Sequence, residues 1–544
     1  MNNTTISAKL PPKFIKQTPE YLKDFLTKLT IPSELTLDWL STVGENALLE
    51  KRAYIEAENL MLASRLHKRI PDQLDFFETA VILAFIIPFK NIYVSKESND
   101  TLLGAYQMQG PHKGIYETNI ETLYRLVDVV SPKFRDRDIQ DTLNKIKRIV
   151  PTKTQTTDSN LVIANNGIFN KTTKKLEPFS PDYIYLAKLA IDYKDNPQNP
   201  ILIADDGYKW DVDTWISELA IDEETNQLIW QVISDFIQSG YSREKAIFFY
   251  SQSGNNGKGT LGQLMKNIVG KGNYSSLAIV DFKHEFLKES LLGVTANIAD
   301  ENDVDQYIDS IRDFKASITG DDINVNRKFE KPIRLQFRGT NIQMLNGLPK
   351  TRDKSDSFYR RLILVPFLKS FTNNGQRTYI KDVYIKNKEV LEYVLWKAFN
   401  MDFETFIIPE RSKELLKDYK EINNPVVQFW NELESEFVWD LLPTQFLYDL
   451  FISWFSRNNP MGKPMSKQSF MDNLRIIIDS STLWENHFEK NDKVKTGKKM
   501  MGDEPLITDY QLVNWYNQAR LGSKPSEKLR EFTRKSSYRG ITRK

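Results

Sequence analysis

The sequence contains no cysteine among its 544 residues. This absence excludes disulfides, zinc ribbons and thiol catalysis, and it fits a reducing compartment. The N-terminus lacks a basic start followed by an apolar core, so we expect no signal peptide. The longest apolar run, residues 80–89, is about half a membrane span and contains Pro88, which favours a buried helix end. We therefore expect a cytoplasmic protein with no membrane partner.

The chain as a whole also lacks a large excess of charge of either sign. The formal net charge is +2, and the composition of 40% hydrophobic and 27% charged residues is that of an ordinary globular protein. However, residues 441–544 hold 18 Lys and Arg residues against 11 Asp and Glu residues. This local excess predicts contact with nucleic-acid phosphates at the C-terminal end, with a merely solvated basic tail as the alternative.

The strongest chemical signal is a predicted strand, a glycine-rich loop and a helix that follow one another. An apolar run at residues 247–250 predicts a buried strand, and residues 261–269 have helical spacing. In a phosphate-binding loop, backbone N–H groups and the helix N-terminus hold the anion, and here Lys258 would reach the outer phosphates. The sequence departs from the usual pattern at Gln252 and Gly259. A surface turn with a solvated lysine is the alternative.

A pair of acids forms a second signal of the same class. A small-apolar strand at residues 291–299 ends in Asp300 and Glu301, 42 residues after Lys258. An ATPase needs one acid to hold the magnesium shell and another to polarise the attacking water. A solvated turn is the alternative for the pair alone. The acids at residues 136–138 resemble a primase metal pair, but we interpret them as acids that favour a helix start.

Two alternating runs, residues 323–329 and 333–337, flank a turn and predict a β-hairpin. Arg327, Lys328 and Lys331 would lie near its tip, where they would contact a nucleic-acid backbone. An ordinary charged hairpin is the alternative.

Polar residues border two further predicted strands. Asn346 follows a strand at residues 341–345, and its side chain would touch the γ-phosphate or the water. Arg360 and Arg361 directly precede a buried strand. An arginine placed there would reach a neighbouring subunit's nucleotide and neutralise the charge of the transition state. The sequence does not choose between the two arginines, and a solvated pair is the alternative.

The C-terminal part is predicted to contain a helix at residues 442–455 and a second at 465–478, with Ser466 as N-cap. A basic stretch follows. This order is consistent with a winged helix that lays its second helix in a DNA groove. The predicted DNA contacts of this part are Lys467, Arg475, Lys493, Lys495, Lys498 and Lys499.

The succession of these features resembles the helicase superfamily 3 branch of the AAA+ ATPases, and it is closest to the phage-satellite and poxvirus primase-helicases. The matching motifs are residues 254–260 (Walker A), 296–301 (Walker B), 319–322 with the basic hairpin, Asn346 (sensor 1) and 359–362 (arginine finger). With no cysteine and no primase acids, the chain is similar to the self-loading, MCM-like replicative helicases of staphylococcal chromosome cassettes and pathogenicity islands.

The resemblance implies a multidomain α/β fold with an AAA+ P-loop ATPase core. The expected segments are a helical N-terminal accessory region (1–90), an α+β domain (91–240), the AAA+ core (241–375), a helical segment or linker (376–435), a C-terminal winged-helix domain (436–522) and a basic tail (523–544). The implied cofactors are ATP and Mg²⁺. The implied nucleotide-binding residues are Gly254, Asn255, Asn256, Gly257, Lys258, Gly259 and Thr260, with Thr260 and Asp300 as metal ligands. Lys258, Asp300, Glu301, Asn346, Arg360 and Arg361 are the implied catalytic residues.

The resemblance also implies an activity and partners. The expected function is that of an ATP-dependent, homo-hexameric DNA helicase, moving 3′ to 5′ on single-stranded DNA during replication of a mobile genetic element. Duplex DNA and a primase, polymerase or other replication protein of the same element are the expected partners. The alternative is an ATP-switched, origin-binding initiator that does not translocate. A DNA-packaging motor fits poorly because no nuclease cluster follows the ATPase motifs.

Overall fold

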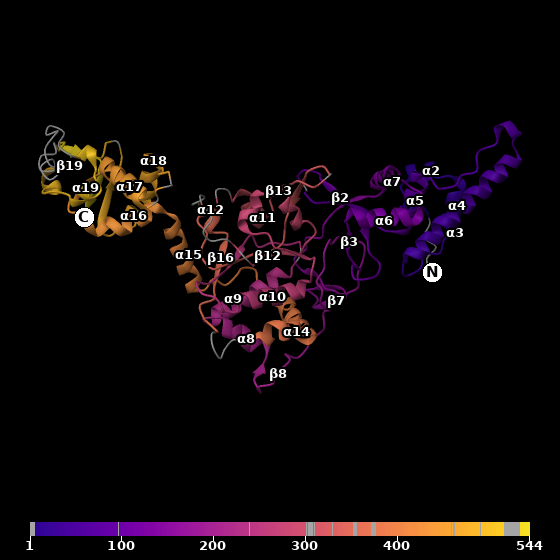
Figure 1. Cartoon of the computed structure of the whole chain (residues 1–544), viewed down its shortest axis with the longest axis horizontal. Coiled ribbons are helices and arrows are strands. Elements are labelled where there is room, and N and C mark those ends of the chain that lie inside the picture. Colours follow the sequence, from indigo (N-terminus) through magenta and orange to yellow (C-terminus); the bar gives the residue numbers. More distant parts are fainter. Residues whose placement is uncertain are drawn as a thin grey trace. The chain divides into compact units, whose positions relative to one another are not determined.

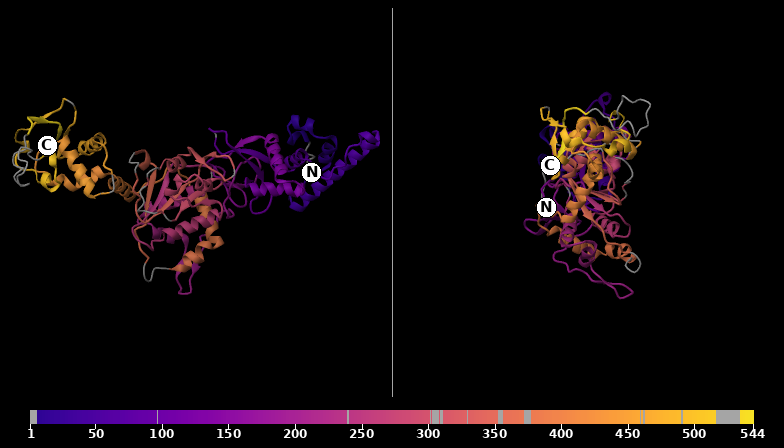
Figure 2. Two further views of the ribbon diagram at one scale, coloured as in Figure 1. Left: turned by 45° about the horizontal axis from the view of Figure 1, so that its top comes forward. Right: turned by 90° about the vertical axis from the view of Figure 1, so that its left-hand side faces the viewer.

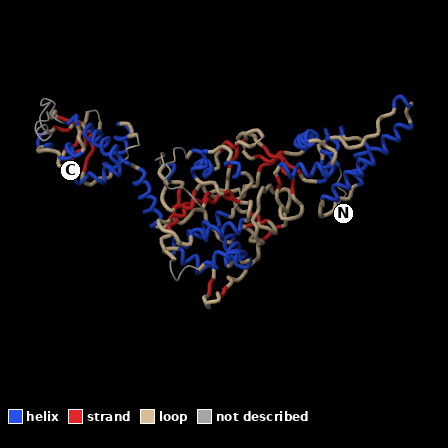
Figure 3. Tube along the Cα trace, viewed as in Figure 1, coloured by secondary structure: helices blue, strands red, loops and turns tan. Residues whose placement is uncertain are grey.

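The computed structural model describes residues 6–95, 97–238, 240–300, 302, 308, 311–328, 330–351, 356–371, 377–458, 460, 463–489, 491–515 and 534–544. The chain forms two compact units, Met1–Lys413 and Glu414–Lys544 (Figure 1). Both units combine helices with sheets (Figure 3), so the predicted multidomain α/β class is confirmed. Among the described residues, no helix is long and apolar enough to cross a membrane.

The N-terminal region is helical, as predicted. Its elements are α1 (Ile6–Lys9), α2 (Pro12–Gln17), α3 (Glu20–Lys28), α4 (Leu37–Leu60), η1 (Ser64–Leu66) and α5 (Phe76–Ile86). Asp75 and Glu78 form a capping box at the start of α5, and the helix is buried from Glu78 to its end. The chain turns back after α4. Asn59 Nδ2 donates to Lys68 O (2.8 Å), and Lys68 N donates to Asn59 Oδ1 (2.7 Å).

A mixed sheet follows, with the strand order β3-β2-β1-β4. Its elements are β1 (Phe89–Tyr93), β2 (Thr101–Tyr106), β3 (Tyr116–Glu117), α6 (Ile120–Val130), α7 (Asp136–Ile149) and β4 (Thr152–Thr154). The acids at residues 136–138 begin α7, and Asp138 Oδ2 accepts from Arg135 N (3.1 Å), which confirms their interpretation as a helix start.

The boundary expected at residue 90 does not separate two cores. Side chains of α1–α5 share one apolar core with β1, β2, α6 and α7, and all of them lie in the indigo and purple part of Figure 2. The physical reason is that α5 is apolar all round and runs directly into β1, so both elements bury the same interior.

A five-stranded parallel sheet forms the centre of the first unit, in the order β11-β12-β15-β10-β16. The strands are β10 (Ala246–Tyr250), β11 (Tyr274–Ser275), β12 (Ala296–Ala299), β15 (Asn341–Leu345) and β16 (Leu362–Pro366). Every residue of β10, β15 and β16 is buried, as expected for strands covered on both faces. Because parallel strands point the same way, the loops after β10, β12 and β15 meet at one edge.

Shorter strands and helices surround this sheet. The strands before it are β5 (Leu161–Ile163), β6 (Ile168–Asn170), β7 (Lys175–Glu177), β8 (Leu202–Ile203) and β9 (Lys209–Trp210). The helices are α8 (Val212–Leu219), α9 (Glu223–Phe236), α10 (Lys258–Val269), η2 (Ile279–Lys283), η3 (Leu287–Leu291), α11 (Arg312–Thr319), α12 (Asp356–Tyr359), α13 (Thr378–Asp382), η5 (Tyr384–Lys386) and α14 (Lys388–Phe399). The predicted hairpin is present as β13 (Asp322–Val325) paired antiparallel with β14 (Ile333–Gln336).

The second unit has its own aromatic core. Its elements, beginning with a helix that crosses the boundary between the units, are α15 (Glu410–Asn423), α16 (Pro425–Leu433), η6 (Glu434–Glu436), β17 (Leu441–Pro443), α17 (Thr444–Asn458), α18 (Lys467–Asp479), β18 (Trp484–His487), β19 (Val494–Lys495), η7 (Gly497–Met500), α19 (Pro505–Asp509), η8 (Val513–Trp515), β20 (Ser537–Tyr538) and β21 (Gly540–Arg543). Ser466 caps α18 as predicted, accepting from Ser469 N (3.3 Å).

The segment at 376–435 is not one linker. Its helix α14 is buried in the core of the first unit, whereas α16 is buried in the core of the second. The reason is that both helices carry large apolar side chains, which each unit buries for itself.

Gly44 allows α4 to pass close to the end of α6. A Cβ at this position would lie 2.2 Å from Val130 O. Gly→Ala normally stabilises a helix interior by about 1 kcal/mol. We expect Gly44→Ala instead to destabilise the first unit by about 1–3 kcal/mol, measured by urea unfolding of the full chain. The exposed neighbour Glu45 gives the control: Glu45→Ala should change stability by less than about 0.5 kcal/mol. A more stable Gly44→Ala would contradict the close approach.

Candidate phosphate-binding site

The loop between β10 and α10 has the backbone conformation of an anion cradle. Asn255 and Gly257 have φ values of 54° and 79°. Gly257 is required, because a Cβ there would also lie 2.3 Å from Leu219 Cδ2. The N-cap of α10 is Gly257, which has no side chain to accept from the first turn, so the N–H groups that follow Lys258 N are available to an anion. Asn256 braces the loop, donating to Ser253 O and accepting from Lys258 N (3.2 Å).

Lys258 lies under this loop as a buried cation with neutral partners. Its Nζ donates to Ser251 Oγ (2.9 Å), Leu345 O (2.7 Å) and Asn346 Oδ1 (2.8 Å). The residue is 7% exposed, and burial lowers the pKa of its ammonium to about 8. Among the described residues, no carboxylate pairs with Lys258. The arrangement is therefore one that an anionic phosphate would complement.

The structure brings Asn346 to this lysine, and the expected contact of its side chain with the γ-phosphate or the water stays a prediction. Asn346 follows β15, the strand that lies directly beside β10. The contribution of Ser251 was missed, although it is the first residue after β10 and its position was a usable signal.

Asp300 lies at the same edge, directly after β12. Its Oδ2 lies 2.5 Å from Lys266 Nζ, and its side chain is 55% exposed. Sequence reasoning missed Lys266, which stands eight residues after Lys258 and is turned about 80° from it around α10. Glu301, the second predicted acid, lies outside the described residues.

The residues at this edge fit a magnesium ion bound together with a nucleotide. Among the described residues, no group of three His, Cys, Asp or Glu side chains forms a complete metal cage. Magnesium does not need one, because it is usually held by one or two carboxylates, phosphates and waters. Asp300 offers a carboxylate and Thr260 a hydroxyl. A Cβ added at Gly259 or at Gly254 would meet no heavy atom within 4 Å. Thr260 is turned about 100° around α10 from Gly259.

The two arginines lie at the opposite edge of the sheet. β16 pairs with β10 from Ala246↔Leu362 to Tyr250↔Pro366. Arg360 and Arg361 directly precede β16, whereas the loop follows β10, so the length of a strand separates the arginines from the loop. At 3.3 Å per residue this places them about 16 Å from the edge that carries the loop. Arg360 is exposed, whereas the guanidinium of Arg361 donates to Ser357 O. Neither arginine is placed to serve the loop of its own chain.

Of the three cations predicted near the hairpin tip, two are exposed. Lys328 and Lys331 are exposed. The side chain of Arg327 is only 12% exposed and forms ion pairs with Glu289 (Nε–Oε1, 3.4 Å) and Glu330. Arg327 is thus removed from the set of exposed DNA-binding candidates, because two nearby carboxylates already neutralise it.

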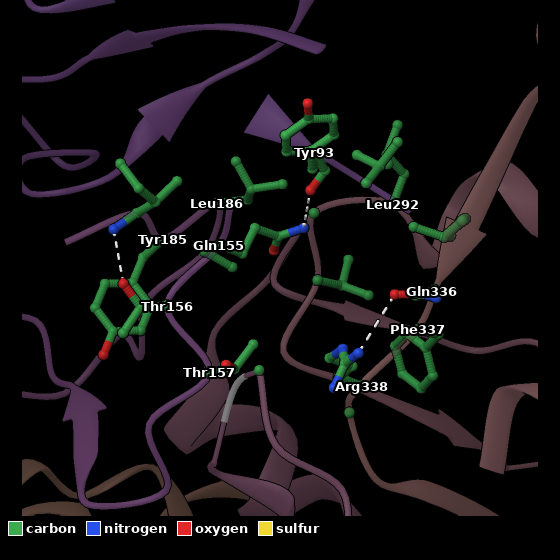
Figure 4. Close-up of a pocket in the computed structure, with 18 of the residues that line it drawn as sticks. Tyr93, Gln155, Thr156, Thr157, Tyr185, Leu186, Leu292, Gln336, Phe337 and Arg338 are labelled. Carbon is green, nitrogen blue, oxygen red and sulfur yellow. Dashed lines mark hydrogen bonds between the residues drawn. The ribbon is translucent and has the colours of Figure 1, made fainter. Parts of the chain in front are cut away.

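Three hydrogen bonds fasten this hairpin to the segment around β1 and β2. They run from Ser95 Oγ to Asp322 Oδ1 (2.7 Å), from Gln336 N to Val94 O (2.8 Å) and from Arg334 N to Asp100 Oδ2 (2.9 Å). A cavity of about 60 Å³ lies beside this contact, and Figure 4 shows Gln155 reaching Tyr93 O across from Arg338. None of the predicted site residues lines this cavity.

In the second unit, the predicted DNA contacts divide into two groups. Lys493, Lys495, Lys498 and Lys499 are exposed on β19, η7 and the residue before β19. In contrast, Arg475 is paired with Glu489 (3.1 Å).

Lys467 on α18 is also engaged. It is half-buried, donates to Gln445 Oε1, and burial lowers the pKa of its ammonium. The exposed face of α18 also carries Asp472 and Asp479. These acids make the helix a poorer phosphate-binding surface than the lysines of β19 and η7.

Comparisons with known families match three parts of the chain. Residues 62–238 match a family described as D5 N terminal like, residues 249–361 a family of unknown function (DUF5906), and residues 421–506 a family described as poxvirus D5 protein-like. These matches support a D5-type primase-helicase relationship. They also support a replication-related role in which the protein acts on DNA.

The chain is also similar to two solved structures of the NrS-1 C-terminal region. One shares 12% identity over 81% of this chain and 95% of its own, with a TM-score of 0.40. Another shares 13% identity over 71% of this chain and 94% of its own, with a TM-score of 0.41. No curated protein matches the chain.

The lowered pKa of Lys258 predicts proton uptake on nucleotide binding. At pH 8 the ammonium is about half ionised, and phosphate charge raises its pKa again, so binding should take up about half a proton. The measurement is calorimetry with a non-hydrolysable ATP analogue in two buffers of different ionisation enthalpy. Lys258→Arg is the control, because a guanidinium stays protonated and should take up none. Equal uptake by both proteins would assign the proton to another group.

Proposed function

We propose that the chain is an ATP-dependent DNA helicase that assembles as a ring, with a homo-hexamer as the expected form. The observation that carries the proposal is the hydrogen bond from Lys258 to Asn346, next to a loop with positive φ angles at Asn255 and Gly257. The strand order adds support, because β15 lies between β10 and β12 and so places Asn346 between the loop that follows β10 and the acid that follows β12. The D5-type matches before and after this sheet in the sequence support the same class of protein.

The proposed chemistry assigns one role to each group at the loop edge. Residues 254–260 would cradle the phosphates of ATP, and Lys258 would bind the β- and γ-phosphates. Asn346 would sense the γ-phosphate, and Glu301 would orient the attacking water. Mg²⁺, held by Asp300 and the hydroxyl of Thr260, would neutralise charge on the phosphates.

The position of the arginines favours a ring. Arg360 and Arg361 lie at the sheet edge remote from the chain's own loop. In a head-to-tail assembly, one edge of each subunit faces the other edge of the next, and such interfaces form a ring when the rotation between subunits closes. An arginine of one subunit would then complete the site of its neighbour.

The hairpin is the proposed grip on single-stranded DNA. Lys328 and Lys331 are exposed, and their ammonium groups suit contact with the sugar-phosphate backbone. The resemblance further suggests 3′ to 5′ movement and a role in the replication of a mobile genetic element, with a primase or polymerase as a further partner.

The second unit is proposed to be a winged-helix domain that binds duplex DNA. The helices α17 and α18 lie between β17 and β18 in the sequence, and β21 lies between β17 and β18 in the sheet. Because α18 presents acids, the main phosphate contacts are assigned to Lys493, Lys495, Lys498 and Lys499.

An initiator that marks or melts an origin without translocating is the second candidate. The separate core and exposed lysines of the second unit favour it, because such a unit would bind duplex DNA by itself. Both candidates use the same ATPase groups, so only a movement assay separates them.

Unwinding of a forked duplex tests the helicase. We expect wild-type protein to unwind forks with a 3′ tail in the presence of ATP and Mg²⁺, but not forks with only a 5′ tail. Glu301→Gln should still bind nucleotide and lose unwinding, because the water is no longer polarised. DNA-stimulated ATP hydrolysis without unwinding would favour the initiator.

In the same assay, Lys328→Ala should keep nucleotide binding and lose at least about tenfold in unwinding rate, consistent with a lost charge-assisted contact. Lys381, an exposed lysine on α13, provides the matched control. If Lys328→Ala unwound forks at the full rate, the hairpin would not contact the translocating DNA. If the protein is an initiator, Lys328→Ala should keep its site-specific DNA binding.

Salt dependence tests the assignment in the second unit. For duplex DNA, the double change Lys498→Ala and Lys499→Ala should reduce the slope of log K against log salt by about 2. Arg475→Ala should leave the slope unchanged, because Glu489 already pairs with that arginine. The measurement is fluorescence anisotropy over a series of salt concentrations. A larger effect of Arg475→Ala would return the main contact to α18.

A further inference from the structure

The carboxylate proposed to hold magnesium is already occupied by a lysine of the same chain. Asp300 Oδ2 and Lys266 Nζ are 2.5 Å apart. Lys266 belongs to α10, the helix that begins at the phosphate loop. The partner of the metal-binding acid therefore lies on the helix that directly follows the loop.

The two partners differ in how easily they move. The side chain of Lys266 is 7% exposed, whereas that of Asp300 is 55% exposed. The Lys266 ammonium also lies 5.3 Å from the centre of the Tyr274 ring, an additional favourable contact. The lysine is thus fixed by its surroundings, and the aspartate is the partner that is free to turn towards solvent or a ligand.

The described residues that line the cavity beside Lys266 include no carboxylate to replace Asp300. This cavity of about 420 Å³ is lined by two further lysines, Lys271 and Lys386, together with Tyr274. Both lysines are exposed. An ammonium that loses its carboxylate here remains close to charges of its own sign, and this opposes release of Asp300.

We propose that Lys266 competes with the divalent cation for Asp300 and so lowers the affinity of the site for magnesium-bound nucleotide. This inference rests on the proposed function, because it concerns the same site. A carboxylate oxygen that accepts the ammonium is unavailable to a metal ion until the pair opens. The apparent affinity for the metal falls in proportion to the closed fraction. Lys266 is therefore a positioning residue that sets when Asp300 is available.

The test compares nucleotide affinity with and without metal in the full chain. A fluorescent, non-hydrolysable ATP analogue is titrated in Mg²⁺ and in EDTA, and the ratio of the two affinities is the readout. Lys266→Met keeps an apolar chain of similar size but removes the charge. We expect its ratio to rise about fivefold, the effect that one partly exposed ion pair exerts.

Two variants control for other effects. Lys271→Met removes a neighbouring exposed lysine that does not contact Asp300, and Lys266→Arg keeps the charge. We expect both to keep the wild-type ratio. Circular dichroism establishes that each variant is folded, and Lys266→Gln replaces Lys266→Met if the latter is not.

An unchanged or lower ratio in Lys266→Met would overturn the inference, because Lys266 would then be irrelevant to the metal or would help Asp300 to bind it. Equal tightening in Mg²⁺ and EDTA would leave the ratio unchanged and overturn it as well. Failure of the wild-type protein to bind the analogue at all is a different outcome, since it would refute the proposed function itself.

Discussion

A buried ammonium without a charged partner is the constraint on which the rest of the site depends. Lys258 satisfies its three hydrogen bonds with a hydroxyl, a backbone carbonyl and an amide. Neutral partners only partly offset the cost of removing the charge from water, which is why its pKa is lowered to about 8. An anion at the neighbouring loop would recover this cost. The left-handed backbone conformation at Gly257 serves the same end, since it turns backbone N–H groups towards that position.

The parallel sheet separates two kinds of positive charge. Its carboxyl edge gathers the loop, Lys258 and Asn346, whereas its amino edge carries Arg360 and Arg361. If both sets faced one ligand in one chain, the arginines would have to cross the length of β16. A second subunit removes this difficulty, because its amino edge can face the carboxyl edge of the first. The ring is thus proposed for a geometric reason and not only because of the resemblance.

Much of the local structure was predictable because it depends on nearby residues. The apolar run before the loop, the strand before Asn346 and the Ser466 cap are short-range patterns, and each is found where the sequence placed it. The misses involve residues distant in the sequence. Glu289 neutralises Arg327 from 38 positions away, and Lys266 holds Asp300 from 34 positions away. Likewise, α5 and β1 look like separate segments until the core they share is seen. Periodicity contains no information on such partners.

The attachment of the hairpin links the accessory region to the proposed motor. β13 and β14 carry the exposed lysines, yet their backbone and Asp322 are bonded to Val94, Ser95 and Asp100. A hairpin that moved alone during hydrolysis would have to break these bonds in each cycle, whereas one that moved together with β1 and β2 would keep them. Because β1 and β2 share their core with α1–α7, a hairpin that moved together with these strands would carry the N-terminal part of the first unit with it.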